Sequence, residues 1–309
     1  MVGNVIQAKA SALPLLVLFA FVVTFIAMIG RASDGATPMP ARAPASVEKL
    51  TVAADAWGFG ELNPVQNRGS TFLRDYYLSL LLERDETGAI VPMLATEWKG
   101  SPEGWSLTLN PDARWQDGSP VTAEDVKFTF EAGAGDNTNP KFQKYPQFKG
   151  AWAASRIRET VDEVQMIAPH RVFIKTRRPD PLFLWAFSGI GFHIFYIGPK
   201  DYLLKVGHEG YLAKPLGNGP YKVKEFNPQD RVVFERWEDF WGNYPHYKKP
   251  QARVMEIILN TDDTARFALL KSRQADVVVN IPYITAKDIP REPGKGPLWL
   301  QVLPGTGNQ

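Results

Sequence analysis

Residues 113–126 read ARWQDGSPVTAEDV, and this stretch combines the local signals around which the rest of the chain is organised. Asp117 and Gly118 are typical of a tight turn, because both residues tolerate the backbone angles that turns require. Thr122 is followed three residues later by Asp125, a capping-box pattern that predicts a helix running to about Glu131. We therefore expect a turn followed at once by a capped helix.

Strands and one helix are predicted on the N-terminal side of this unit. The apolar run at 49–54 predicts a buried strand, and the alternation at 105–109 predicts a half-buried one. Between them, apolar residues at three-to-four spacing predict a helix capped by Ser70 or Thr71 and running to about Leu81.

The C-terminal side mixes antiparallel strands with a crossover. Strands are predicted at 161–167 and 171–176, and again after a Gly-rich tight turn at 217–220. A strand at 254–259, a helix at 263–272 capped by Thr261 or Asp262, and a strand at 275–279 predict a parallel crossover. Together these elements predict an α/β fold that contains an inserted subdomain.

Charge and cysteine content exclude several classes of protein. The chain has 309 residues, 35 basic and 33 acidic, and the two basic residues Lys9 and Arg31 precede the first acid, Asp34. The remainder is therefore neutral, which argues against nucleic-acid binding. The absence of cysteine excludes disulfides, thiolate metal sites, cysteine nucleophiles and a lipid-modified N-terminal cysteine.

The N-terminus has the pattern of an export signal. From Leu15 to Ile29 only Thr24 is polar, and basic residues flank this run. Because the run is short for a membrane span, both a cleaved signal peptide and a retained membrane anchor over 1–33 remain open. Three prolines among small residues predict an extended linker over 34–46.

The sequence contains few of the patterns that indicate a catalytic site. The four histidines show no metal-ligand spacing, and no nucleophile elbow or phosphate-binding loop occurs. Carboxylates do occur side by side at 124–125, 238–239 and 262–263, but adjacent side chains diverge and do not form an acid–base pair. Aromatic loops are more informative, since residues such as Trp57 and Tyr145 could supply apolar walls for a ligand.

The order of these segments resembles a known family. The run PMLATEW at 92–98, the strand at 105–109, the ARWQDGSPVTAEDV stretch and the GNGPY turn at 217–221 resemble the dipeptide and oligopeptide solute-binding proteins of ABC importers. The resemblance covers about 48–309. It departs mildly from the family at the end of the crossover helix, where the usual sGevD run is SRQAD at 272–276 and Asp276 is kept.

The resemblance implies a periplasmic-binding-protein-like fold of class II and the three-domain type. Domain I would comprise 48–82 plus 177–303 and hold a mixed sheet, and the smaller α+β domain II would be inserted at 83–176. Residues 304–309 would begin a truncated domain III, because members of this family are longer. With the far lobe missing, we expect the 309-residue chain alone to bind peptides weakly.

The resemblance also implies that the protein binds its ligand and does not catalyse a reaction. The chain would capture peptides or similar small solutes outside the cytoplasmic membrane, in the periplasm or an equivalent compartment, and deliver them to the permease subunits. We expect a monomer without cofactor, metal or catalytic residue. By position in the family pattern, the expected ligand-binding residues are Gly69, Ser70, Tyr145 and Thr306, with Trp57 in addition.

Two other functions remain as alternatives. A membrane-tethered sensor or interaction module with the same fold is favoured if the leader stays uncleaved. An exported hydrolase is the third reading, and turnover of ester, amide or glycoside substrates would support it.

Overall fold

The computed structural model describes residues 4–8, 47–58, 61–67, 72–85, 87–188, 196–247, 249–287, 289–290 and 298–302. The helices are α1 (Arg74–Tyr77), α2 (Ala123–Gly133), α3 (Ala154–Thr160), α4 (Phe183–Ala186), α5 (Lys200–Ala213), α6 (Asp263–Lys271) and α7 (Tyr283–Ala286). The strands are β1 (Asn4–Ala8), β2 (Val47–Ala54), β3 (Leu82–Arg84), β4 (Ile90–Pro92), β5 (Ala95–Ser101), β6 (Gly104–Leu109), β7 (Val161–Ala168), β8 (Arg171–Thr176), β9 (Tyr221–Asn227), β10 (Arg231–Arg236), β11 (Ala252–Leu259), β12 (Val277–Val279) and β13 (Leu298–Val302).

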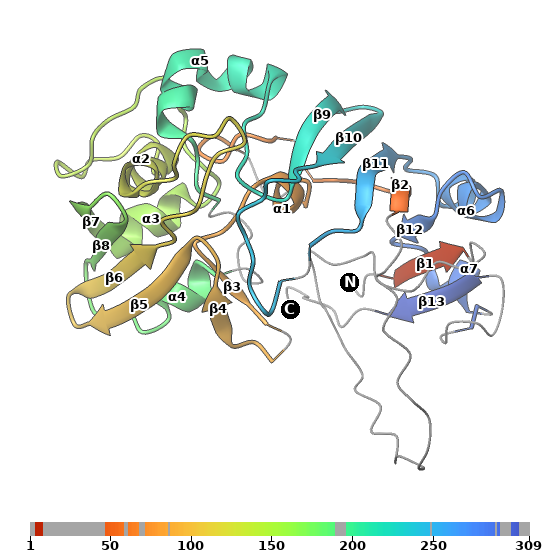
Figure 1. Cartoon of the computed structure of the whole chain (residues 1–309), viewed down its shortest axis with the longest axis horizontal. Coiled ribbons are helices and arrows are strands. Elements are labelled where there is room, and N and C mark those ends of the chain that lie inside the picture. The colour runs from red at the N-terminus through yellow and green to blue at the C-terminus, as the bar shows by residue number, and fades with distance from the viewer. Residues whose placement is uncertain are drawn as a thin grey trace, which may run out of the picture.

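The main sheet has seven strands in the order β13-β1-β12-β2-β11-β10-β9 and occupies one side of the molecule (Figure 1). β2 pairs in parallel with both β11 and β12, and the other pairs are antiparallel. Along β2, Val52 belongs to the large core and Ala53 to a smaller core that also contains Leu270 of α6. Burial on both faces explains why the second part of this strand, from Leu50 to Ala54, carries no charged residue and does not alternate between buried and exposed positions.

The predicted parallel crossover is confirmed. α6 connects β11 to β12, and both strands run parallel to β2, which lies between them. The Asp262 side chain accepts a hydrogen bond from the Ala265 backbone N–H at 2.7 Å, so Asp262 is the N-cap.

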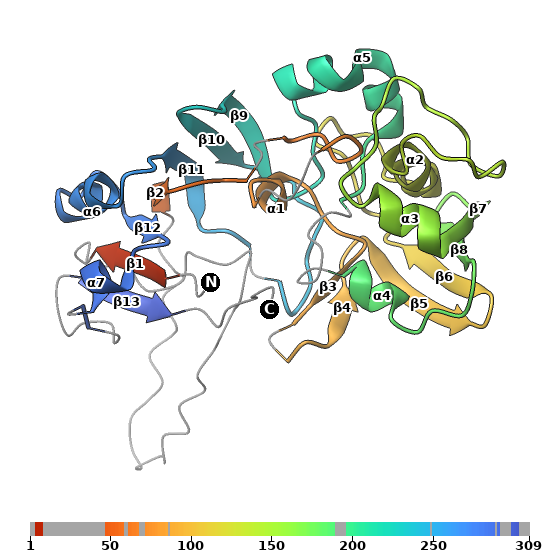
Figure 2. The ribbon, with the colours of Figure 1, turned by 180° about the vertical axis from the view of Figure 1, so that it is seen from behind.

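A second sheet, in the order β5-β6-β8-β7, forms the other side of the molecule and is antiparallel throughout. The helices α2 and α3 pack against it, α2 on β7 and β8 and α3 on β7, as Figure 2 shows from behind. The predicted capping box is present at the start of α2, where Asp125 accepts a 2.9 Å hydrogen bond from the Thr122 backbone N–H.

The helix expected up to Leu81 is wrong in its extent. α1 ends at Tyr77, and Leu78 is already extended, with φ −120° and ψ 153°. The following backbone pairs instead with distant segments, since Leu80 bridges to Tyr196 and Leu82 bridges to Ser188. Tertiary pairing of this leucine-rich run therefore overrides its helical spacing.

The start of the expected leader contributes a strand to the main sheet. Asn4–Ala8 form β1, whose backbone pairs with both β12 and β13. The apolar run 15–29 and the expected linker 34–46 lie outside the described residues. Within the described part of the chain, no helix is long and apolar enough to cross a membrane.

A junction formed by Tyr77, Gln116, Gly217, Asn218 and Gly219 joins the two sides of the molecule. The Tyr77 carbonyl oxygen accepts hydrogen bonds from the backbone N–H groups of Asn218 at 3.1 Å and Gly219 at 2.9 Å. Gln116, which precedes α2, donates from its side chain to the Gly219 carbonyl oxygen and exchanges two hydrogen bonds with Gly217. We refer to these five residues as the Tyr77 junction.

The close backbone approach in the Tyr77 junction requires glycine. A Cβ atom at Gly217 would fall well inside van der Waals contact with the Tyr77 carbonyl oxygen, and one at Gly219 would lie 2.7 Å from the Tyr77 carbonyl carbon. Both neighbours are backbone atoms and do not rotate away. The Gly-rich turn at 217–220 is therefore a packing element.

Replacing this glycine tests the junction. We expect Gly217→Ala to lower the free energy of unfolding by about 3 kcal/mol or more, because the added methyl displaces backbone. Urea titration followed by tryptophan fluorescence measures this change. The matched control is Gly133→Ala in α2, whose Cβ would meet Ile157 at an ordinary 3.4 Å and should change stability by about 1 kcal/mol or less. Equal unfolding midpoints for the two variants would contradict the packing role.

Candidate functional site

Two loops that lead to expected ligand-binding residues are tied together. The Gln66 side-chain oxygen accepts a hydrogen bond from the Lys149 backbone N–H at 2.9 Å, and the Asn67 side-chain oxygen accepts one from the Trp152 N–H at 3.4 Å. Gln66 and Asn67 directly precede the segment that contains Gly69 and Ser70. The structure therefore places the approach to that segment beside the end of the 142–152 loop.

The 61–67 segment is itself held rigidly. The Asn63 side-chain oxygen accepts hydrogen bonds from the N–H groups of Val65 at 2.9 Å and Gln66 at 3.2 Å, closing a tight turn. Asn67 is buried and donates from its side chain to the carbonyl oxygens of Asn63 and Pro64. A side chain with these bonds positions its neighbours in one geometry.

Of the five expected ligand-binding residues, Gly69, Ser70 and Thr306 lie outside the described residues. Trp57 is buried, and its ring packs against that of Phe226 of β9, with 6.5 Å between the ring centroids. Tyr145 is also buried and packs edge-on against Phe128 of α2 at 4.9 Å. Burial raises the pKa of Tyr145 to about 12. The two rings pack against different elements, and the ligand-binding role of all five residues stays a prediction.

Sequence reasoning missed the residues that tie the loops. Gln66 and Asn67 stand just before the expected segment, and Trp152 stands a few residues after Phe148. The only sign of these residues in the sequence was that they lie beside two segments expected to bind the ligand. The hydrogen bonds between them span more than eighty positions, so spacing along the chain does not reveal them.

An aromatic loop between β10 and β11 forms a second link between the two sides of the molecule. The Tyr244 hydroxyl donates to the Met93 carbonyl oxygen at 2.5 Å and accepts a hydrogen bond from the Asn110 side chain at 2.9 Å. The Trp241 indole N–H donates to the Asn218 carbonyl oxygen at 3.0 Å. The loop thus fastens the β3–β4 and β5–β6 region to the Tyr77 junction.

Two half-buried carboxylates lie near this loop. Burial raises the pKa of Glu83 on β3 to about 7, and burial raises the pKa of Asp75 on α1 well above its usual range. The charge of Glu83 also acts on Asp75 and on the hydroxyl of Tyr247. This part of the molecule therefore favours a neutral or cationic neighbour at neutral pH.

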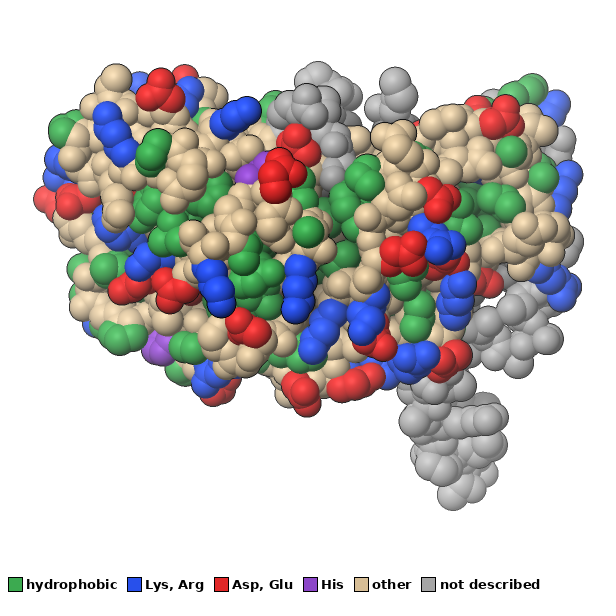
Figure 3. Space-filling view, turned by 90° about the horizontal axis from the view of Figure 1, so that it is seen from above, with side chains coloured by type: hydrophobic (Ala, Val, Ile, Leu, Met, Phe, Trp, Pro, Cys, Tyr) green, Lys and Arg blue, Asp and Glu red, His purple; other side chains and the backbone are tan. Residues whose placement is uncertain are grey.

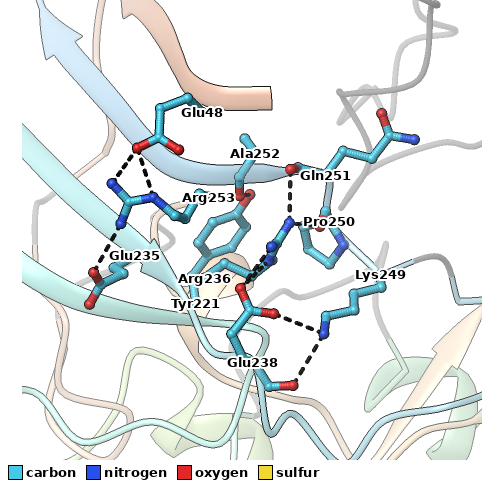
Figure 4. A network of polar contacts seen from close by, with 10 residues as sticks. All are labelled: Glu48, Tyr221, Glu235, Arg236, Glu238, Lys249, Pro250, Gln251, Ala252 and Arg253. Carbon is cyan, nitrogen blue, oxygen red and sulfur yellow. Dashed lines mark hydrogen bonds and ion pairs between the residues drawn. The ribbon is translucent and has the colours of Figure 1, made fainter. Parts of the chain in front are cut away.

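Three of the carboxylates singled out in the sequence, Glu124, Asp125 and Glu238, form ion pairs or caps that stabilise the fold. Glu124 pairs with Lys200 at 2.5 Å, and Asp125 caps α2 and accepts a hydrogen bond from the Lys200 N–H. Glu238 is held by Arg236 and Lys249 in the polar network of Figure 4. Ion pairs and caps of this kind leave no free acid–base pair among these residues.

A cavity of about 630 Å³ lies where α2 and α5 begin, near the turn between β7 and β8. Its lining includes the Lys200–Glu124 ion pair and the capping carboxylate of Asp125, together with Met166 and Pro199. Neither Trp57 nor Tyr145, the two expected ligand-binding residues that the structure describes, lines this cavity. Its charged groups mainly stabilise the starts of the two helices.

Two further observations concern charge. No group of three or more histidine, aspartate and glutamate side chains in the described part of the chain is arranged to hold a metal ion. On the face drawn in Figure 3, acidic and basic side chains are intermingled. That face therefore lacks the one-sided basic field of a nucleic-acid-binding surface.

Comparison with known sequences gives a specific match. Residues 89–306 match the family described as bacterial extracellular solute-binding proteins, family 5 Middle. The dipeptide-binding protein of Escherichia coli K12 is 25% identical over 236 residues, which cover 71% of this chain and 41% of that protein. The periplasmic murein peptide-binding protein MppA of the same organism is 29% identical over 180 residues, which cover 55% of this chain and 32% of MppA.

Solved structures share the fold. The oligopeptide-binding protein AppA of Bacillus subtilis, in complex with a nonapeptide, gives a TM-score of 0.62 at 22% identity and covers 80% of this chain and 47% of AppA. NikZ of Campylobacter jejuni, in complex with Ni(L-His), gives a TM-score of 0.59 at 25% identity. The match covers 77% of this chain and 45% of NikZ. These similarities confirm the periplasmic-binding-protein-like α/β fold. The chain spans about two fifths of the length of the first curated relatives.

The raised pKa of Glu83 predicts a pH dependence of stability. Between an unfolded pKa of about 4.3 and a folded value of about 7, the folded state binds more protons than the unfolded state, so stability falls as pH rises through this window. We expect Glu83→Gln to remove this fall and to gain on the order of 2 kcal/mol over the wild type between pH 5 and pH 8.

Chemical denaturation of both proteins across this pH range measures the difference. Glu97→Gln, at an exposed position of β5, is the control and should follow the wild type. Parallel pH curves for the wild type and Glu83→Gln would contradict the assignment.

Proposed function

Because the chain belongs to family 5 of the bacterial extracellular solute-binding proteins, we propose that it is the substrate-binding component of an ABC importer for peptides. In this proposal it captures peptides outside the cytoplasmic membrane and delivers them to the permease subunits. The single observation that carries the proposal is the family match over 89–306, since relatives at this level of similarity are named as peptide-binding proteins.

We propose a ligand wall built from the segment around Gly69 and Ser70 and from the 142–152 loop. The hydrogen bonds from Lys149 and Trp152 to the side chains of Gln66 and Asn67 support this assignment, because they hold the two loops side by side. Thr306 and Trp57 remain part of the proposal by their position in the family pattern.

The proposal includes a division into domains. Domain I comprises 48–82 plus 177–303, domain II comprises 83–176, and 304–309 begin domain III. The strands β5 to β8 support it, because they form one sheet from contiguous sequence, whereas β2 joins β9 to β12 in the other. We further propose that 1–33 direct export, that 34–46 act as a linker, and that the protein acts as a monomer.

Binding in this proposal involves no catalysis. Recognition of extended peptides relies on backbone hydrogen bonds and on pockets for side chains, and neither requires a reactive group. The relatives described above are named as binding proteins, so we do not carry forward the sensor or hydrolase alternatives.

Peptide uptake by cells tests the function. We expect deletion of the gene to reduce the uptake of labelled di- to pentapeptides at least tenfold, because the permease receives its cargo from the binding protein. Reintroduction of the gene should restore uptake, and uptake of a labelled free amino acid serves as the control. Unchanged uptake of every peptide length after deletion would contradict the proposal.

A further inference from the structure

The cavity of about 630 Å³ at the starts of α2 and α5 crosses the seam between the two sides of the molecule. One wall comes from the turn before α2 and from the turn between β7 and β8, and the other comes from the start of α5 and from Leu216. Trp115 and Leu216 of this lining directly precede Gln116 and Gly217 of the Tyr77 junction. A partner that fills the cavity therefore touches both sides at the point where they are joined.

Hydrogen bonds fix the walls of this cavity. The Asp125 side chain accepts the Lys200 backbone N–H at 2.9 Å, so the starts of α2 and α5 are tied to each other. The Ala123 N–H donates to the Pro169 carbonyl oxygen at 2.8 Å and ties α2 to the turn between β7 and β8. A partner thus meets a preformed surface, and less conformational entropy is lost when it binds.

Two large apolar side chains are exposed at the rim of the cavity. Met166 is 47% exposed and Ile167 is 56% exposed, and both belong to the lining. They lie near the end of β7, the edge strand of its sheet, where the register with β8 shifts between Met166 and Ala168. Because a bulge of this kind disfavours pairing with a further strand, contact with a partner is left to the side chains. Adjacent exposed apolar side chains beside a cavity are typical of an interaction surface.

The charged part of the lining is mainly acidic. It consists of four carboxylates and two lysines, namely Asp117, Glu124, Asp125, Asp201, Lys200 and Lys205. Glu124 and Lys200 pair with each other at 2.5 Å. Asp201, in the first turn of α5, is exposed. With two more carboxylates than ammonium groups, the cavity is complementary to a basic side chain.

We infer that this cavity is a docking site for the permease, and that it receives a segment in which a basic side chain is next to an apolar one. The acidic lining attracts the basic side chain, and Met166 and Ile167 cover the apolar one. The inference rests on the proposed function, in which the permease must recognise this protein. Neither Trp57 nor Tyr145 lines the cavity, so the permease and the peptide use different surfaces.

Photocross-linking in cells tests the contact. Benzoylphenylalanine replaces Ile167 in cells that lack the native gene and carry epitope tags on the permease subunits required for peptide uptake. The matched control places it at Leu182, the N-cap residue of α4, which is 63% exposed and lies outside the lining. We expect irradiation to join position 167 to a permease subunit and to give at least about tenfold less of this product from position 182.

Charge reversal measures what the contact contributes to transport. We expect Asp201→Lys to lower the initial rate of peptide uptake about tenfold, because the new ammonium group repels a basic segment. Glu209→Lys is the control, since Glu209 lies on the same helix, has a side chain that is 92% exposed and is not part of the lining. Its uptake should stay within about twofold of the wild type. Immunoblots establish that the proteins are present at equal levels.

Concentration separates docking from ligand binding. If Asp201→Lys weakens docking, a larger amount of this variant in the cell should restore uptake by mass action, whereas a higher peptide concentration should not.

Three results would overturn the assignment while the wild type still takes up peptides. The first is a cross-link from position 167 to a second copy of this chain or to no permease subunit, and the second is equal cross-linking from positions 167 and 182. The third is an Asp201→Lys rate equal to that of the wild type, or a defect that more peptide corrects, which would mean that the cavity holds the peptide. If the wild type supports no peptide uptake, the proposed function fails and the assignment falls with it.

Discussion

The carbonyl oxygen of Tyr77 is the contact on which the arrangement of the chain depends. It accepts the backbone N–H groups of Asn218 and Gly219, and the Asn218 side chain in turn accepts the N–H of Ser79 at 2.8 Å. Gln116 adds bonds from the sheet that contains β5 to β8. Segments more than a hundred residues apart therefore meet with no room for a side chain at Gly217. Both sides of the molecule are fixed relative to this point.

A ligand wall that draws on both sides of the molecule needs such a constraint. The loop 61–67 leaves the main sheet, whereas the 142–152 loop belongs to the other side, and their hydrogen bonds form only if the two sides keep one relative position. The Tyr77 junction and the aromatic loop around Tyr244 supply two separate links. Rigid placement lowers the entropy that a ligand must remove when it binds.

The sequence correctly predicted the helices and strands that are determined by neighbouring residues. The capping box of Thr122 and Asp125 and the crossover from β11 through α6 to β12 follow from neighbouring residues. The helix expected up to Leu81 stopped at Tyr77, because distant strands compete for its backbone. Aromatic content pointed to Tyr145 as part of a loop that could face a ligand, but its orientation depends on Phe128 of α2, against which the ring packs in the core. The expected ligand-binding residues came from family resemblance, and only Trp57 and Tyr145 fall within the described residues.

Native-state hydrogen exchange tests the central claim most directly. If the Tyr77 junction holds the two sides together, the amide hydrogens of Asn218 and Gly219 exchange only when the whole protein unfolds, and their protection equals that of the central strands β2 and β11. Exchange of these two amides at the rate of an exposed turn, while β2 and β11 stay protected, would show that the junction opens independently and would contradict the account.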